Sequence, residues 1–336
     1  MLQLRVTVPT DLTGAVLDVL RDDPAVSALV VGTGTALRPE GDVVTADVAR
    51  EAADDVIERL LALDVQQVGT VQLTPVDTWV SRAGWEAERL APGASADSVV
   101  WPQVVLRAYD DTELTWTFLS FMTLATLLAS VAIIVDSQVL VIGAMVLGPE
   151  FGAVAALGVA LVRRRWRLLR RAALALLVGF VVAIGLTAVA ALVLRGAGWV
   201  TLDDVTGPRP GTDFIYRPDR WSIVVAVIAG AAGVLSLTSS RVGGLTGVFI
   251  SVTTIPAAGN LALGIAFGVA HEITGSVLQL VVNISGMAVA GWLTLIVQQT
   301  VWQHVSVRRA RFAARIGRTA THGPHAGPLR PPDGTA

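Results

Sequence analysis

The chain has 336 residues, of which 53% are hydrophobic and 15% charged, and its formal net charge is −2. Its mean hydropathy is +0.63, and its charged fraction lies well below the roughly 25% of typical globular proteins. The absence of cysteine excludes disulfides, thiolate chemistry and cysteine-based zinc sites. Charged residues are concentrated in residues 1–115 and in the C-terminal tail, which predicts a soluble N-terminal domain followed by an integral membrane domain.

The first 78 residues carry the pattern of a small α+β domain. Residues 2–8 alternate apolar and polar side chains, which predicts a half-buried strand. The next expected elements are a helix from about residue 10, strands at 26–32 and 42–48, a helix at 51–63 and a strand near 69–76. This βαββαβ order predicts a ferredoxin-like domain. No signal-peptide pattern precedes it, so we expect it to be cytoplasmic. It contains no catalytic, cofactor-binding or metal-binding motif, and we expect no enzymatic activity.

Residues 79–116 join the two domains. Their apolar residues recur at helical spacing and are mixed with acidic and aromatic side chains. Such a segment suits an amphipathic helix that lies at the membrane interface. Packing against the soluble domain is an equally good interpretation.

Residues 117–300 contain six apolar segments long enough to cross a hydrocarbon core of about 30 Å. The predicted spans are 117–135, 138–162, 172–194, 221–238, 243–270 and 273–297. The loop RRRWRLLRR, which lies between the second and third spans, should face the cytoplasm because positive loops remain inside. Both termini are then cytoplasmic, in a bacterial cytoplasmic (inner) membrane. The tail, residues 301–336, is expected to be basic at first and then disordered.

The second predicted span is interrupted near its middle. From Ser137 to Val162 it would extend about 39 Å as one helix, longer than the hydrocarbon core. Proline removes a backbone donor and clashes with the preceding turn, so Gly148-Pro149 predicts a broken helix. Glu150 follows directly and is the only charged side chain deep inside a predicted span, where it costs about 2.5–3.5 kcal/mol. Glu150 suits coupling to H⁺ or Na⁺, and capping of the second half-helix is the structural alternative.

The fifth predicted span has a related interruption. Pro256 lies near its middle, with Thr253 and Thr254 before it and Asn260 after it. Similar short motifs, AALG and LALG, follow the two prolines in the same order. We therefore predict an inverted 3+3 repeat, of residues 117–194 and 221–297, whose broken second and fifth helices meet near the midplane. The polar side chains at both breaks are candidate ligands for a solute or ion.

Two further polar pairs lie at predicted span ends. Asp136 and Ser137 follow the first span and either bind the solute or form a turn. His271 and Glu272 separate the last two spans and form either an external gate or a loop pair.

The motif around the first break resembles a known family. It consists of Asp136, Ser137, Ile142, Gly143, Ala144, Met145, Gly148 and Pro149. This motif resembles domain-of-unknown-function family 389, the "uncharacterised hydrophobic domain" membrane proteins, and the likeness extends through residues 117–297. Many members have an apolar residue and a second proline where this chain has Glu150 and Ala153. The resemblance implies the architecture and no established activity.

Together these features favour a secondary transporter or permease of a small solute, with alternating access around Pro149 and Pro256. An ion channel, or a membrane sensor that uses the soluble domain, is the alternative. The expected partners are the lipid bilayer, an unknown small solute or ion and other copies of the chain in a homo-oligomer, with no nucleic acid.

Overall fold

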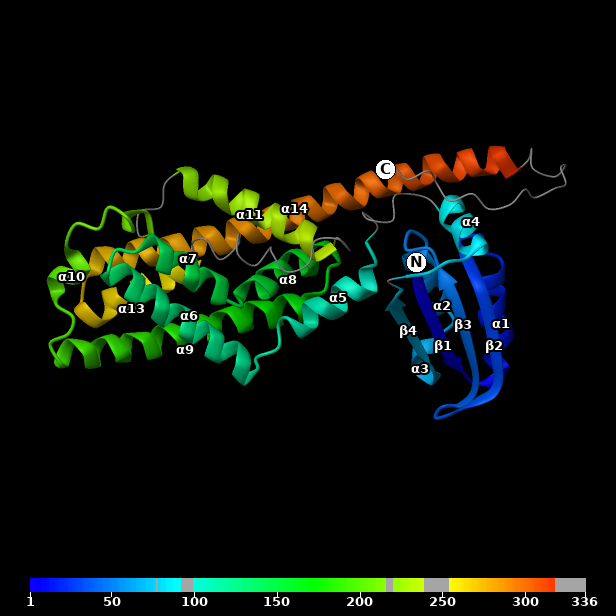
Figure 1. Ribbon diagram of the computed structural model, residues 1–336, viewed down its shortest axis with the longest axis horizontal. Helices are drawn as coiled ribbons and strands as arrows, with labels where there is room; N and C mark the ends of the chain where they lie inside the picture. The colour runs from blue at the N-terminus through cyan, green and yellow to red at the C-terminus, as the bar shows by residue number, and fades with distance from the viewer. Residues whose placement is uncertain (77, 92–98, 216–219, 239–253, 318–336) are drawn as a thin grey trace. The chain divides into compact units, whose positions relative to one another are not determined.

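The computed structural model describes residues 1–76, 78–91, 99–215, 220–238 and 254–317, with side chains as far as residue 301 except at 214 (Figure 1). The chain divides into two compact units. Unit 1 holds residues 1–95 and 301–336, and unit 2 holds residues 96–300.

Unit 1 contains a four-stranded antiparallel sheet with the strand order β2-β3-β1-β4. Its elements are β1 (Leu2–Val8), α1 (Thr10–Arg21), β2 (Val26–Leu37), β3 (Glu40–Val48), α2 (Ala53–Leu61), α3 (Val65–Val68), β4 (Thr70–Pro75) and α4 (Arg82–Leu90). The alternating residues Leu2, Leu4, Val6 and Val8 are all buried, as the sequence pattern predicts. A small antiparallel α+β domain at the N-terminus is therefore confirmed.

Asp42 ties the turn region of this sheet to α1. Its carboxylate accepts hydrogen bonds from the Gly34 backbone N–H at 2.8 Å and from the hydroxyls of Thr13 at 2.7 Å and Thr10 at 3.4 Å. Gly34 has a φ of +63°, a conformation that glycine adopts without steric cost. These bonds, the one from Gly34 first, hold the pKa of Asp42 below its ordinary value, because they stabilise the charged form.

Unit 2 is helical. Its elements are α5 (Trp101–Asp110), α6 (Trp116–Ile134), α7 (Gln138–Leu147), α8 (Glu150–Val162), α9 (Trp166–Gly196), α10 (Leu202–Thr206), the 3₁₀ turn η2 (Asp213–Ile215), α11 (Arg220–Thr238), α13 (Thr254–Phe267) and α14 (Ala270–Gly317), the last of which continues into unit 1. In the described residues, α6, α9, α11 and α14 are each long and apolar enough to cross a membrane. The bent pair α7 and α8 makes a fifth span if it is counted as one. Of the expected span 243–270, the structure describes only the shorter apolar helix α13 and the turn after it.

Helix α5 belongs to the membrane-domain bundle. Its buried residues share an apolar cluster with residues of α8 and α9. The guanidinium of Arg163 lies 5.2 Å from the ring centre of Trp101, and that of Arg171 lies 5.7 Å from the ring centre of Tyr109. This part of the joining segment therefore packs on the membrane helices, whereas packing against the soluble domain was one of the two expected arrangements.

The two helices that follow the predicted breaks pack on many neighbours. Helix α13 contacts α6, α7 and α9, and it approaches α14 at Gly264. Helix α8 contacts α5, α9 and α11, and it approaches the backbone of α14 at Gly158. At Gly259, the nearest atoms of α6 leave no room for a side chain, so α13 and α6 lie in direct backbone contact. These small residues bring α8 and α13 into the interior of the bundle.

Candidate functional site

The predicted break between α7 and α8 is present. Helix α7 ends at Leu147, α8 begins at Glu150, and the two helices are bent by 58°. Pro149 is the residue directly before α8, a place where its missing N–H costs no helical hydrogen bond. Gly148 is extended, with a ψ of 121°, and turns the chain from one helix to the next. Local backbone chemistry therefore places Glu150 at the positive end of the α8 dipole.

Glu150 is buried and contacts the other predicted break. Its side chain is 1% exposed, and its Oε1 accepts a hydrogen bond of 2.7 Å from the hydroxyl of Thr254, the first described residue of α13. We call Glu150 and Thr254 the helix-start pair. Pro256 lies within the first turn of α13, so any interruption of the fifth span precedes it. Thr253 and the segment before it lie outside the described residues.

The helix-start pair is distant from both ends of the bundle. The 13 residues of α8 put Glu150 about 20 Å from the turn that leads into α9. The 14 residues of α13 put Thr254 about 20 Å from the opposite end, where α13 turns into α14. A carboxylate and a hydroxyl thus meet near the middle of the apolar bundle, where a polar group is stable only with a partner or with water.

A second polar group lies near the end of the bundle where α13 turns into α14. It consists of Arg209, Asn260, Glu272 and Ser276, which we call the Arg209 cluster, and all four side chains are buried. The guanidinium of Arg209 lies 2.7 Å from Glu272 Oε1 and donates a hydrogen bond of 3.2 Å to Asn260 Oδ1. The Asn260 amide nitrogen donates to Glu272 Oε2 at 2.6 Å and to the Ser276 hydroxyl at 2.8 Å. Both oxygens of the glutamate and both ends of the amide are paired.

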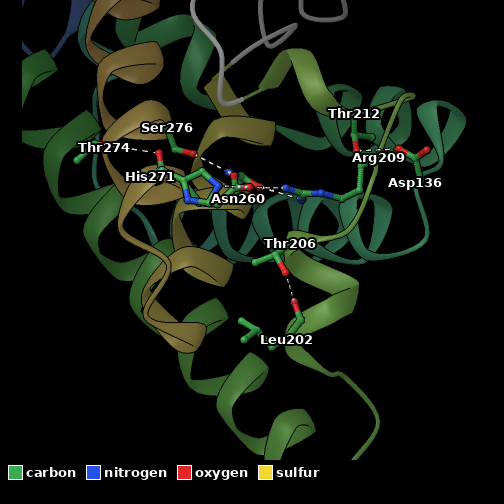
Figure 2. Close-up of polar contacts among 10 residues, drawn as sticks. Asp136, Leu202, Thr206, Arg209, Thr212, Asn260, His271, Thr274 and Ser276 are labelled. Carbon is green, nitrogen blue, oxygen red and sulfur yellow. Dashed lines mark hydrogen bonds and ion pairs between the residues drawn. The ribbon is translucent and has the colours of Figure 1, made fainter.

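Arg209 enters this cluster from the loop between α10 and η2. Figure 2 shows its side chain reaching toward Asn260, with Asp136 and Thr212 at the base of the same loop. Asp136 accepts hydrogen bonds from the Thr212 hydroxyl at 2.8 Å and from the Gly211 N–H at 3.1 Å, so it fixes the loop. Pro210 follows Arg209 directly and disfavours a helical backbone at that residue.

The remaining candidates lie around these two groups. Ser137 caps α7 by accepting a hydrogen bond of 3.4 Å from the Leu140 N–H. His271 is exposed, and its Nε2 lies 3.5 Å from Glu272 Oε1. The structure therefore brings Glu150 together with Thr254 and brings Asn260 together with Glu272, but it places these as two separate groups along the bundle.

Sequence reasoning missed Arg209 and Ser276. The signal for Ser276 was its position one turn after Glu272 on the same helix face. The signal for Arg209 was its place between two prolines, in a loop with few other cations. Neither signal identifies the partner, because Arg209 and Glu272 are 63 residues apart in sequence.

Comparison with known families supports the resemblance to family 389. A family model described as "Domain of unknown function (DUF389)" matches residues 145–289. Residues 145–289 belong to the DUF389 family. The predicted resemblance to this family is thereby confirmed over residues 145–289, a shorter range than the expected 117–297. No curated protein and no solved structure matches the chain.

The DUF389 segment runs from the end of α7 into α14 and contains both the helix-start pair and the Arg209 cluster. Asp136, which fixes the Arg209 loop, precedes it. With four long apolar helices and a bent pair in its described residues, the chain is a multi-pass membrane protein. The DUF389 description names no activity, so function has to be argued from the site.

Proposed function

We propose that the protein is a secondary transporter of a small solute. Its alternating access would take place around the junction where the start of α8 contacts the start of α13. The observation that carries this proposal is the 2.7 Å hydrogen bond between Glu150 and Thr254. It joins the starts of two helices, 104 residues apart, about 20 Å from either end of the bundle. Secondary transporters bind substrates and coupling ions at such junctions of discontinuous helices.

The packing supports an inverted repeat. Helix α8 packs on α9, the third helix of its own half, and on α11 and α14, the first and third helices of the other half. Helix α13 packs on α14 of its own half and on α6 and α9 of the other half. Apart from α5, which contacts α8, and α7, which contacts α13, the two helices have equivalent neighbours among the long described helices, as a two-fold relation between halves requires. The strand order of unit 1 likewise supports a ferredoxin-like fold for the N-terminal domain.

Charge distribution supports the orientation. The arginine-rich loop at 163–171 would face the cytoplasm, with both chain termini on the same side. The Arg209 cluster then lies at the outer end of the bundle, where its complete pairing would close the external entrance. In this orientation Glu150 is the coupling residue, and it exchanges an H⁺ or Na⁺ as the transporter cycles.

The test is a Glu150→Gln variant in proteoliposomes. The probes are ¹⁴C-labelled glycerol, urea, alanine and glutamine, with an imposed pH or Na⁺ gradient. Wild-type vesicles should accumulate at least one of these above empty liposomes, and Glu150→Gln should lose the gradient dependence because the amide cannot carry the coupling charge. Glu113→Gln, the same change at an exposed glutamate outside the spans, is the matched control and should transport normally.

Accumulation by Glu150→Gln that still follows the gradient would contradict the coupling role. A flux above about 10⁶ ions per second through the wild-type protein would indicate a channel, because each transport cycle of a carrier is limited by μs–ms conformational steps.

A further inference from the structure

One face of α14 carries a line of buried polar side chains. Glu272, Ser276, Gln279 and Asn283 follow one another at steps of four, three and four residues, which places them on the same side of the helix. All four are at most 1% exposed. A line of this length, with four polar groups and no exposure, is unusual in a helix that is otherwise apolar enough to cross a membrane.

The two halves of this line differ in their pairing. Glu272 and Ser276 are fully engaged in the Arg209 cluster. By contrast, neither the oxygen nor the nitrogen of the Gln279 and Asn283 side-chain amides has a hydrogen-bond partner among the residues that the structure describes. We call Gln279 and Asn283 the amide pair. Buried polar side chains are almost always hydrogen-bonded in proteins, so these four amide atoms require partners from outside the described chain, either water or a bound solute.

The amide pair lies at the depth of the helix-start pair. Helices α13 and α14 run in opposite directions, with Asn260 bonded to Ser276 and Gly264 close to Ile273. Continuing that register by about six residues at 1.5 Å each brings Thr254 to the level of Asn283.

Packing places the two pairs in the same region. Met287 follows Asn283 by one turn and shares an apolar cluster with Val154 of α8 and Ile255 of α13. Those two residues are close neighbours of Glu150 and Thr254 in sequence. The amide pair therefore lies beside the proposed junction, further along α14 than Glu272 and Ser276 of the Arg209 cluster.

We propose that Gln279 and Asn283 form the hydrogen-bonding site for the transported solute, and that this solute is small and uncharged, with both hydrogen-bond donors and acceptors. An amide side chain offers an acceptor oxygen and a donor NH₂ group. A bound cation would use only the oxygens and an anion only the NH₂ groups, which leaves the other half of each amide buried and unpaired. A neutral solute with both kinds of group pairs all four atoms. This inference rests on the proposed transport function and specifies its substrate class.

The chain has no cysteine, so single-cysteine variants need no background substitutions. Gln279→Cys, Asn283→Cys and the control Ser285→Cys, on the exposed face of the same helix, are reconstituted in proteoliposomes. The probes are three methanethiosulfonates with uncharged hydroxyethyl, cationic trimethylammonioethyl and anionic sulfonatoethyl groups. At 279 and 283 the uncharged reagent should react at least about 50-fold faster than either charged one, because an unpaired charge is costly at this depth. Ser285→Cys should react slowly with all three.

Fastest reaction with either charged reagent at 279 and 283 would overturn the uncharged substrate class. Reaction no faster than at 285, with every reagent, would overturn the site itself. If a cysteine variant does not fold, Gln279→Met and Asn283→Leu provide the second measurement. They should remain folded and lose at least about tenfold in uptake of the uncharged probes, glycerol and urea, the loss expected when a buried hydrogen-bonding contact to a ligand is removed.

These outcomes are separable from the test of Glu150. Full uptake in Gln279→Met and Asn283→Leu, together with loss of gradient dependence in Glu150→Gln, would refute the amide site and leave the transporter proposal intact. Uptake lost in the amide variants, together with unchanged gradient dependence in Glu150→Gln, would refute the coupling role and support the site.

Discussion

Glu272 and Ser276 of the Arg209 cluster lie on the same face of α14 as the amide pair, yet the two groups differ in how their buried polar atoms are paired. In the cluster, the guanidinium, the carboxylate, the amide and the hydroxyl bind one another. Further along the same helix, the amides of Gln279 and Asn283 have no partner in the described part of the chain. A saturated network stabilises one arrangement of the helices, whereas unpaired groups bind whatever solute or water reaches them. The contrast matches the two proposed roles, closure of the outer entrance by the Arg209 cluster and solute binding by the amide pair.

The largest expected effect on stability comes from removing one partner from the fully paired Arg209 cluster. Arg209→Ala leaves the carboxylate of Glu272 buried without its cation, which should lower the free energy of unfolding by about 3–5 kcal/mol. Thermal unfolding in detergent, followed by size-exclusion chromatography, measures this loss. The double variant Arg209→Leu with Glu272→Leu removes both charges and should be more stable than Arg209→Ala. A double variant that is less stable than the single one would contradict the view that the unpaired charge causes the loss.

The next effect concerns the helix contact that positions Asn260 in the cluster. A Cβ at Gly259 would lie 2.9 Å from the Cβ of Ala129 and 2.9 Å from the backbone nitrogen of Ser130. Gly259→Ala should therefore force α13 away from α6 and cost about 1–3 kcal/mol. Gly185→Ala in α9 is the matched control, because a Cβ there meets nothing within 4 Å, and it should leave stability equal or higher. Equal unfolding temperatures for both variants would show that the α13–α6 contact is looser than described.

Substitutions in the amide pair should change the free energy of unfolding by a smaller amount and in the opposite direction. Gln279→Met and Asn283→Leu remove buried amides without partners, so each should raise the free energy of unfolding in detergent by about 1–3 kcal/mol, less any cost of repacking. Ser285→Leu, on the exposed face, should change it by less than about 0.5 kcal/mol. Destabilisation by both amide variants would indicate that the amides already have partners, and the contrast with the Arg209 cluster would fail.

The smallest effect extends the comparison to a fully paired carboxylate outside the membrane. The pKa of Asp42 is lower in the folded chain than its ordinary value of 3.8. Its contribution to stability is therefore fully present above about pH 4 and is lost as the pH falls through the folded pKa. Asp42→Asn should increase amide hydrogen exchange in β1 and β3 of the full-length protein at neutral pH, and the difference from wild type should shrink in acid. A difference that does not change with pH would contradict this assignment. Asp11→Asn, at an exposed carboxylate, is the control.

Features set by local backbone chemistry could be predicted from the sequence. The bend between α7 and α8 follows from Gly148-Pro149, and the first strand follows from strict alternation over residues 2–8. Four long apolar helices were also predictable, because apolar segments of this length have few other stable environments.

Features that depend on distant partners could not be predicted. The sequence marks Glu150 and Thr254 as polar groups beside breaks, and it is the fold that joins them across 104 residues. In the sequence, Arg209 is indistinguishable from an ordinary cation in a loop. Only the fold shows that it contacts Asn260 of α13 and Glu272 of α14. For Asn283 the sequence shows a polar residue within a span, but whether its amide is paired depends on which helix faces it.

The length of α9 has a consequence for how lipid acts on the protein. Between Arg171 and Arg195 its apolar part extends about 36 Å, which exceeds a typical hydrocarbon thickness by about 6 Å. Such hydrophobic mismatch is relieved by leaning roughly 35° from the bilayer normal or by recruiting longer acyl chains. Since α9 packs on both α8 and α13, its inclination is mechanically linked to the two helices that meet at Glu150. The acyl-chain length of the bilayer should therefore change the rate of the proposed transport, and this effect does not require a specific lipid-binding site.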